Sequence, residues 1–115
     1  MSLRGGRVAE AMKEEISDII HNHLKDPRIG FASITGVEVS GDLRHARVFV
    51  SVLGDDRQKQ DTLRGLESAV GFVRSEIGKR IRMRHTPEIV FKLDESIERG
   101  IRVSRLIDQE KRGGQ

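Results

Sequence analysis

The fold of this chain is decided by residues 66–84, which read LESAVGFVRSEIGKRIRMR. The apolar residues recur at the three- and four-residue spacing of a helix face and continue a stripe that begins at Leu63. The segment Ala69-Val70-Gly71 is expected to interrupt this helix, because Gly71 tolerates backbone angles that other residues avoid. Pro87 ends the segment. The stretch therefore predicts two helices joined at a kink, although close packing alone would also explain the small Ala69.

The second half of this stretch is strongly basic. Residues 74–84 contain one acid, Glu76, and five basic side chains, a local surplus of four in a chain whose net charge is +3: Arg74, Lys79, Arg80, Arg82 and Arg84. Helical spacing places Lys79 and Arg82 opposite the apolar stripe and Arg74 and Arg80 at its edges. Such a cluster attracts a polyanion, and a solvated helix face is the alternative reading.

The residues before this stretch predict one helix and a pair of strands. An apolar stripe from Val8 to Leu24 indicates an amphipathic helix, which residues 26–30 end as a loop around Pro27. Residues 34–40, with a bulge at Gly36, and residues 44–53 read as strands, and residues 40–43 form the turn between them. This arrangement predicts an antiparallel hairpin whose outer side carries Arg47, Phe49 and Ser51.

The residues after Pro87 predict a third strand and a short final helix. Residues 88–93 alternate as a strand, residues 94–96 form a turn or helix cap, and residues 97–109 read as a helix weakened by Gly100. At 115 residues the chain fits one domain. We therefore expect a single domain over residues 1–110 and a frayed tail over residues 111–115.

Several functional classes are disfavoured by the sequence. The absence of cysteine excludes disulfides and thiolate chemistry, and it agrees with a reducing, cytoplasmic location. No apolar run is long enough to span a membrane, and no signal peptide is expected. The four histidines do not have the spacing of a metal pair, and no nucleophile with an adjacent base can be assembled. We therefore expect no catalytic residue, no metal and no cofactor.

Aromatic residues are too few for a platform that stacks single-stranded bases. The chain has four phenylalanines and no tryptophan or tyrosine, and we expect Phe72 and Phe91 in the core. Recognition of phosphates and shape in a folded RNA suits this composition better.

The predicted order of helix, strand, strand, helix, helix and strand is that of the type II KH domain, an α+β fold with a three-stranded sheet. The chain closely resembles the bacterial ribosome-binding factor A family over nearly its whole length, most densely at AVGFVRSEIGK (residues 69–79). Supporting segments are KDPR (25–28), DLRHA (42–46), RMR (82–84) with Pro87-Glu88, and LDES (93–96). Ordinary KH domains clamp nucleic acid with a GXXG loop between the central helices. This chain has no GXXG there and has instead the Ala-X-Gly kink of the family, formed by Ala69, Val70 and Gly71.

The resemblance implies a monomeric, non-enzymatic factor that docks on the immature small (30S) ribosomal subunit and its 16S rRNA. It also implies assistance in late subunit maturation, including processing of 16S rRNA at its 5′ end, support of growth in the cold, and no membrane partner. If the kink is a two-state element, Ala69→Gly changes ribosome affinity or the resting conformation. The alternatives are a general KH-like RNA-binding module and a protein-interaction domain that uses its sheet edge.

The candidate RNA-binding residues come from three segments. Arg4 and Arg7 belong to a flexible N-terminal arm. Arg28 belongs to the loop at Pro27, where a structural role is the alternative. The basic stretch supplies Arg74, Lys79, Arg80, Arg82 and Arg84. A further basic edge recurs every three residues along the final helix at Arg99, Arg102 and Arg105, where a solvated face is equally plausible.

Overall fold

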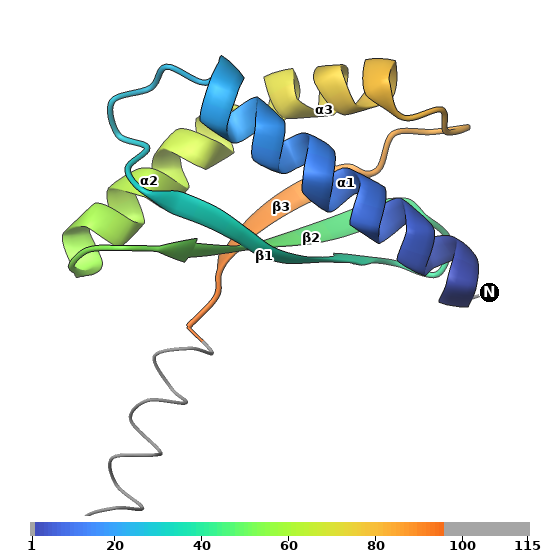
Figure 1. The fold of residues 1–115 in the computed structure, drawn as a ribbon, viewed down its shortest axis with the longest axis horizontal. Helices are drawn as coiled ribbons and strands as arrows, with labels where there is room; N and C mark the ends of the chain where they lie inside the picture. The colour runs from blue at the N-terminus through green and yellow to red at the C-terminus, as the bar shows by residue number, and fades with distance from the viewer. Residues whose placement is uncertain (1, 96–115) are drawn as a thin grey trace, which may run out of the picture.

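The computed structural model describes residues 2–95 and has the predicted order of elements (Figure 1). The elements are α1 (Ser2–His23), β1 (Ala32–Val39), β2 (His45–Val52), α2 (Asp56–Ser68), α3 (Val70–Arg80) and β3 (Glu88–Leu93). The α+β architecture with a three-stranded sheet is confirmed. The predicted helix at residues 97–109, Arg99, Arg102, Arg105 and the tail lie outside the described residues.

The sheet combines an antiparallel and a parallel pair in the order β1-β2-β3. In the antiparallel hairpin of β1 and β2 the register shifts between Ile34, which faces Val50, and Gly36, which faces Phe49. The predicted bulge is therefore present, with Thr35 as the extra residue. Strand β3 runs parallel to β2, so both strands begin at the same end of the sheet.

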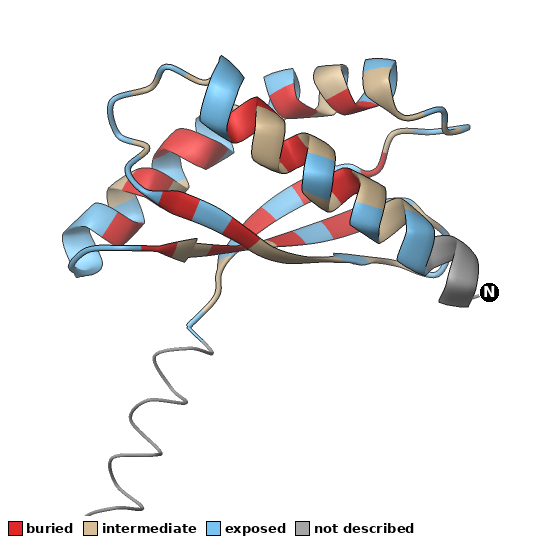
Figure 2. Cartoon of the chain, in the orientation of Figure 1, coloured by how far each residue is buried: buried red, intermediate tan, exposed pale blue. Residues whose placement is uncertain are grey.

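The three helices cover one face of the sheet, and the opposite face is open (Figures 1 and 2). Burial alternates along β2, where Val48 and Val50 are fully buried and Arg47 is exposed. The core between helices and sheet consists of Met12, Ile16, Ile19, Ile20, Ala32, Ile34, Ala46, Val48, Val50, Val52, Leu66, Val73, Ile77, Ile89 and Phe91. Phe91 is in the core as predicted, but Phe72 is 45% exposed, so its predicted burial is wrong. None of the described helices is long and apolar enough to cross a membrane.

The two central helices meet at Ala69, a narrower break than the predicted Ala69-Val70-Gly71. Helix α2 opens with a capping box between Asp55 and Gln58 and ends at Ser68. Ala69 has φ −94° and ψ 0°, while Val70 and Gly71 already belong to the first turn of α3. Gly71 does not have a positive φ, and apart from its chain neighbours and the nearby backbone of its own helix no described atom lies within 4 Å of the place where its Cβ would be. The expectation that Gly71 supplies unusual backbone angles is therefore wrong, since the bridge conformation of Ala69 makes the turn alone.

Helix α3 ends at Arg80, earlier than the basic stretch predicts. Ile81 takes extended angles, φ −118° and ψ 123°, and its amide closes the last turn on the Ile77 carbonyl at 2.8 Å. Arg82 and Arg84 consequently lie on the loop that leads to β3, so the helical placement of Arg82 is wrong. The physical reason is that the chain must reverse here to bring Pro87 and β3 back beside β2.

Candidate nucleic-acid interface

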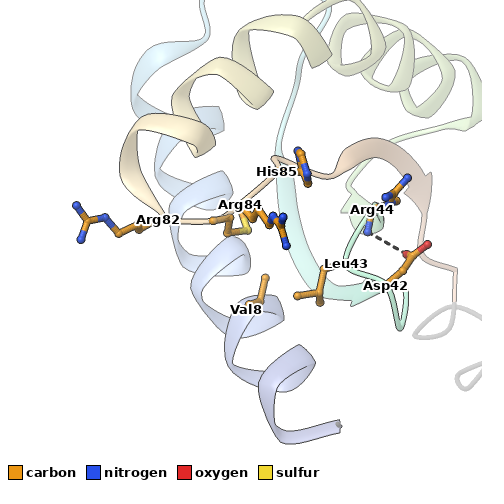
Figure 3. Close-up of a pocket in the computed structure, with 8 residues that line it drawn as sticks. Val8, Asp42, Leu43, Arg44, Arg82, Arg84 and His85 are labelled. Atoms are coloured by element: carbon orange, nitrogen blue, oxygen red, sulfur yellow. Dashed lines mark hydrogen bonds between the residues drawn. The ribbon is translucent and has the colours of Figure 1, made fainter.

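Two loops meet at the end of the sheet where β2 and β3 begin. The loop before β2 carries Arg44 and the loop before β3 carries Arg82 and Arg84. The Glu88 amide donates to the Arg44 carbonyl at 2.8 Å, which ties the two loops together. Between them and the start of α1 lies a pocket of about 670 Å³ lined by Val8, Asp42, Leu43, Arg44, Arg82, Met83, Arg84 and His85 (Figure 3).

The turn before β2 is held by a small hydrogen-bond network. The Asp42 carboxylate accepts from the Ser40 hydroxyl at 2.6 Å and from the Arg44 amide at 3.0 Å, and the Ser40 hydroxyl accepts from the His45 amide at 3.0 Å. The Ser40 hydroxyl, followed by the Arg44 amide, lowers the pKa of Asp42 below its ordinary value of 3.8. The ionised carboxylate of Asp42 is thus part of the turn, and it fixes the position of the Arg44 backbone.

The loop before β3 is anchored from α3 by Arg74. Its guanidinium donates from Nε to the Pro87 carbonyl and from Nη2 to the Thr86 carbonyl, both at 3.1 Å. Gly78 lets this return pass close to the helix, because a Cβ at that position would stand 3.0 Å from Thr86 Oγ1. Arg74 is half-buried and acts here on the backbone of its own chain.

The side chains at the tip of the two loops are turned to solvent. Arg44, Arg82, Arg84 and His85 are exposed, and within the described part of the chain none of the three arginines forms an ion pair. Arg84 points over the pocket, whereas Arg82 points away from it along the outer side of α1 (Figure 3). The pocket end of the molecule therefore presents a concentration of positive charge, which the ionised Asp42 beside Arg44 offsets only in part.

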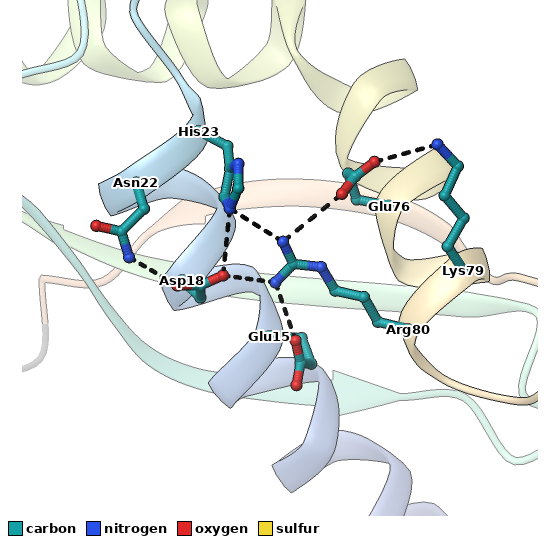
Figure 4. Close-up of polar contacts among 7 residues, drawn as sticks. All are labelled: Glu15, Asp18, Asn22, His23, Glu76, Lys79 and Arg80. Atoms are coloured by element: carbon teal, nitrogen blue, oxygen red, sulfur yellow. Dashed lines mark hydrogen bonds and ion pairs between the residues drawn. The ribbon is translucent and has the colours of Figure 1, made fainter.

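Arg80, by contrast, is held inside a network of charges between α1 and α3 (Figure 4). Its Nη1 lies 2.6 Å from Asp18 and 3.0 Å from Glu15, and its Nη2 lies 3.6 Å from Glu76 and 3.2 Å from His23 Nε2. The side chain is only 21% exposed. Its hydrogen bonds to Asp18, then Glu15, raise the pKa of Arg80, and the bond from Arg80 is the main cause that lowers the pKa of Asp18.

The remaining predicted residues lie away from the pocket or next to it. Lys79 is 71% exposed and 3.4 Å from Glu76. Arg28 forms a pair with Asp26 at 2.6 Å in the loop after α1, which fits its structural reading, and this pair raises the pKa of Arg28. Arg4 and Arg7 lie within α1, so the predicted flexible arm is wrong. Arg7 is exposed beside the pocket residue Val8, and the side chain of Arg4 is outside the described part.

The loop that carries Arg28 packs directly on α2. A Cβ at Gly65 would stand 2.7 Å from Ile29 Cγ1, so only glycine admits this approach. The Thr62 hydroxyl adds contacts of 3.3 Å to the Gly30 amide and the Arg28 carbonyl. Residues 26–30 therefore serve mainly to connect α1 to β1, and they pack on α2 at Thr62 and Gly65.

Comparison with known proteins identifies the family. The protein-family profile of ribosome-binding factor A matches residues 4–107. A ribosome-binding factor A from Natranaerobius thermophilus is 56% identical over 107 residues, which are 93% of this chain and 82% of that protein. The chain belongs to the ribosome-binding factor A family.

Solved structures of ribosome-binding factor A have the same fold. A solution NMR structure of a Thermotoga maritima protein described as a putative ribosome binding factor A has a TM-score of 0.63 at 32% identity, over 84% of this chain and 89% of that one. The crystal structure of the Thermus thermophilus factor has a TM-score of 0.69 at 24% identity, over 77% and 94%. A homology model of the Thermus thermophilus factor, fitted into a cryo-EM map of a 30S complex, has a TM-score of 0.64 at 24% identity, over 76% and 91%.

Of the residues that line the pocket, sequence reasoning named only Arg82 and Arg84 as site residues, and Arg44 and His85 are the basic side chains that it missed. The sequence places Arg44 at the start of the second predicted strand, thirty residues before the basic stretch begins at Arg74, and only the parallel pairing of β2 with β3 brings the two together. The parallel pairing of β2 with β3 is the signal that could have found Arg44, because neighbouring parallel strands begin at the same edge of a sheet. Among the described residues no cluster of three or more His, Asp or Glu side chains is placed to hold a metal ion.

Proposed function

We propose that this chain binds the small ribosomal subunit through the pocket end of the molecule and assists late maturation of that subunit. The observation that carries the proposal is the presence of three exposed arginines, Arg44, Arg82 and Arg84, on the two loops at this end of the molecule, none of which forms an ion pair with the described residues. Guanidinium groups bind phosphates in paired, directional contacts, so this surface suits an RNA backbone. Membership of the family and the 30S complex of the Thermus thermophilus factor support the same partner.

The chain acts by binding and performs no chemistry of its own. A ligand shifts a conformational equilibrium only by its differential affinity for the two states, so the factor favours the rRNA conformation that it contacts best. In this proposal the stabilised conformation is one from which the 5′ end of 16S rRNA is processed efficiently. The protein works as a monomer in the cytoplasm, where immature subunits are available, and supports growth in the cold, when alternative rRNA structures are most persistent.

Co-sedimentation with immature and mature small subunits tests this proposal. The expected result is stronger association with immature subunits, an affinity that falls steeply as salt rises, and weaker association for Arg82→Ala than for the exposed control Lys92→Ala on the open sheet face. Binding to bulk RNA with no preference for subunits would favour a general RNA-binding module. Association that survives complete RNA digestion would favour the protein-interaction alternative.

A further inference from the structure

The pocket at the basic end has an apolar floor. Val8 from α1, Leu43 from the turn before β2 and Met83 from the loop before β3 all line it, and each is only half-buried. Figure 3 shows the Val8 and Leu43 side chains directed toward the same space. Phosphate binding alone does not call for such a floor, because phosphates are bound by charged and polar groups. The apolar surface indicates that the ligand also has a flat or apolar part.

Leu43 is held in this floor at the cost of backbone strain. Its φ of 60° is the only positive φ of a non-glycine residue in the described part of the chain, and a branched side chain adopts this region rarely. The Leu43 amide donates to the Ser40 carbonyl at 2.8 Å, and the Asp42 network described above fixes the residues on both sides. Glycine or asparagine would suit this backbone conformation better, so we attribute the leucine to the apolar side chain that it adds to the lining of the pocket.

The rim of the pocket complements a nucleotide. Arg44 and Arg84 supply phosphate-binding groups, and their planar guanidinium faces, like the His85 ring, can stack on a base. The volume of about 670 Å³ lies within the range of small-molecule sites and exceeds the need of a single phosphate.

We propose that this pocket binds one unpaired nucleotide of a folded RNA, with its base against Val8, Leu43 and Met83 and its phosphate between Arg44 and Arg84. The inference rests on the proposed function, because it names the part of the RNA that the basic surface selects. It adds to phosphate docking a means of recognising an immature subunit, since a nucleotide that is unpaired in one state of the RNA and paired in another can enter the pocket only in the first.

Binding to three RNA hairpins that differ at one site tests the proposal. The first has a continuous stem, the second carries one bulged adenosine, and the third carries the same bulge without its base. The full chain is expected to bind the bulged adenosine about tenfold more tightly than either of the others, as base stacking in a protein site commonly allows. Equal affinity for the three hairpins, including equally weak affinity, overturns the proposal.

The variant Leu43→Asn separates an effect on nucleotide binding from an effect on the stability of the fold. Asparagine tolerates the positive φ, so the thermal unfolding midpoint is expected to stay the same or rise while the preference for the bulged adenosine disappears. Met83→Gln, a change of similar shape in the other loop, is expected to have the same effect on preference. The matched control Leu53→Asn alters a leucine that is 79% exposed beyond the opposite end of β2, and it should keep the preference. A folded Leu43→Asn protein that retains the preference contradicts the proposal.

Co-sedimentation with small subunits, carried out in parallel, distinguishes failure of the nucleotide pocket from failure of the proposed function. Salt-dependent association with immature subunits, together with equal affinity for the three hairpins, overturns the nucleotide pocket and leaves the proposed function standing. Preference for the bulged adenosine without any association with small subunits supports the pocket and overturns the proposed partner.

Discussion

The last turn of α3 and the loop after it carry the same kind of side chain in different surroundings. Arg80 closes the helix and is enclosed by Asp18, Glu15 and Glu76, whereas Arg82 stands two residues further on in a loop and is exposed. Both belong to one basic cluster in the sequence. The difference shows that the number of charges in a segment does not give the charge available to a partner, because acids from distant elements neutralise some of them.

The largest effect should come from removing the exposed charges together. Replacing Arg44, Arg82 and Arg84 by alanine is expected to weaken binding to small subunits by roughly 100-fold at low salt, since each lost phosphate contact also removes counterion release. The unfolding midpoint should change little, because these side chains form no ion pair with the described residues. The measurement is a binding titration with a parallel thermal melt, and retention of full affinity would contradict the assignment of this surface.

Arg74 tests whether a basic residue can influence binding without touching RNA. Arg74→Ala leaves the Thr86 and Pro87 carbonyls without their donor, so the free energy of unfolding should fall by about 1–3 kcal/mol. RNA affinity should fall with it, because the loop that carries Arg84 loses its anchor. Arg74→Lys keeps the charge but not the forked geometry, and chemical denaturation should show only partial recovery. Weakened binding with unchanged stability would mean that Arg74 contacts RNA directly.

The network around Arg80 should make stability sensitive to acid. The pKa of Asp18 is lowered from 3.8, first by its hydrogen bond from Arg80, so its contribution to stability is complete above about pH 5 and is lost as the pH falls through the lower folded-state value. Asp26 and Asp42 have lowered pKa values and act in the same direction.

Thermal melts from about pH 5 to about pH 2 should therefore show a smaller loss of stability for Asp18→Asn than for the unmodified protein. The matched control is Glu14→Gln, an exposed acid on the same helix. A slope for Asp18→Asn that equals that of the unmodified protein would show that the charges between α1 and α3 do not stabilise the fold.

The smallest effect is expected at Gly71. Because Gly71 has helical backbone angles and open space around it, Gly71→Ala should raise the free energy of unfolding by about 0.5–1 kcal/mol and leave subunit binding unchanged. Ala69→Gly at the break itself is the comparison, and hydrogen exchange across residues 66–73 would report a change in the resting conformation. Loss of subunit binding in Gly71→Ala would show that the wider segment Ala69-Val70-Gly71 has a function in binding.

Most of the fold could be predicted from the sequence because its signals are local. The stripe of Met12, Ile16 and Ile20, the alternation in residues 44–53 and the punctuation at Pro27 and Pro87 each depend on neighbouring residues only. The end of α3 could not be placed, since Ile81 continues the apolar spacing of the helix and its extended backbone is set by the return to β3.

The candidate site was only partly predictable because it is assembled from three segments. Arg82 and Arg84 were found by charge. Helical spacing placed Arg80 at the edge of the apolar stripe and Arg82 opposite it, but it did not show that acids enclose Arg80. Two of the three acids around Arg80, Glu15 and Asp18, lie more than sixty residues earlier, on α1. Arg44 became part of the site only through strand pairing, and Leu43 through a backbone angle that no sequence pattern indicates.

The most direct test compares Arg80→Ala with Arg82→Ala in two measurements, the salt dependence of binding to small subunits and the thermal unfolding midpoint. Arg82→Ala is predicted to reduce the slope of log affinity against log salt by about 1 without changing the midpoint. Arg80→Ala is predicted to lower the midpoint and to leave that slope unchanged. A reduced slope for Arg80→Ala with an unchanged midpoint would contradict the division of this basic stretch into an enclosed and an available part.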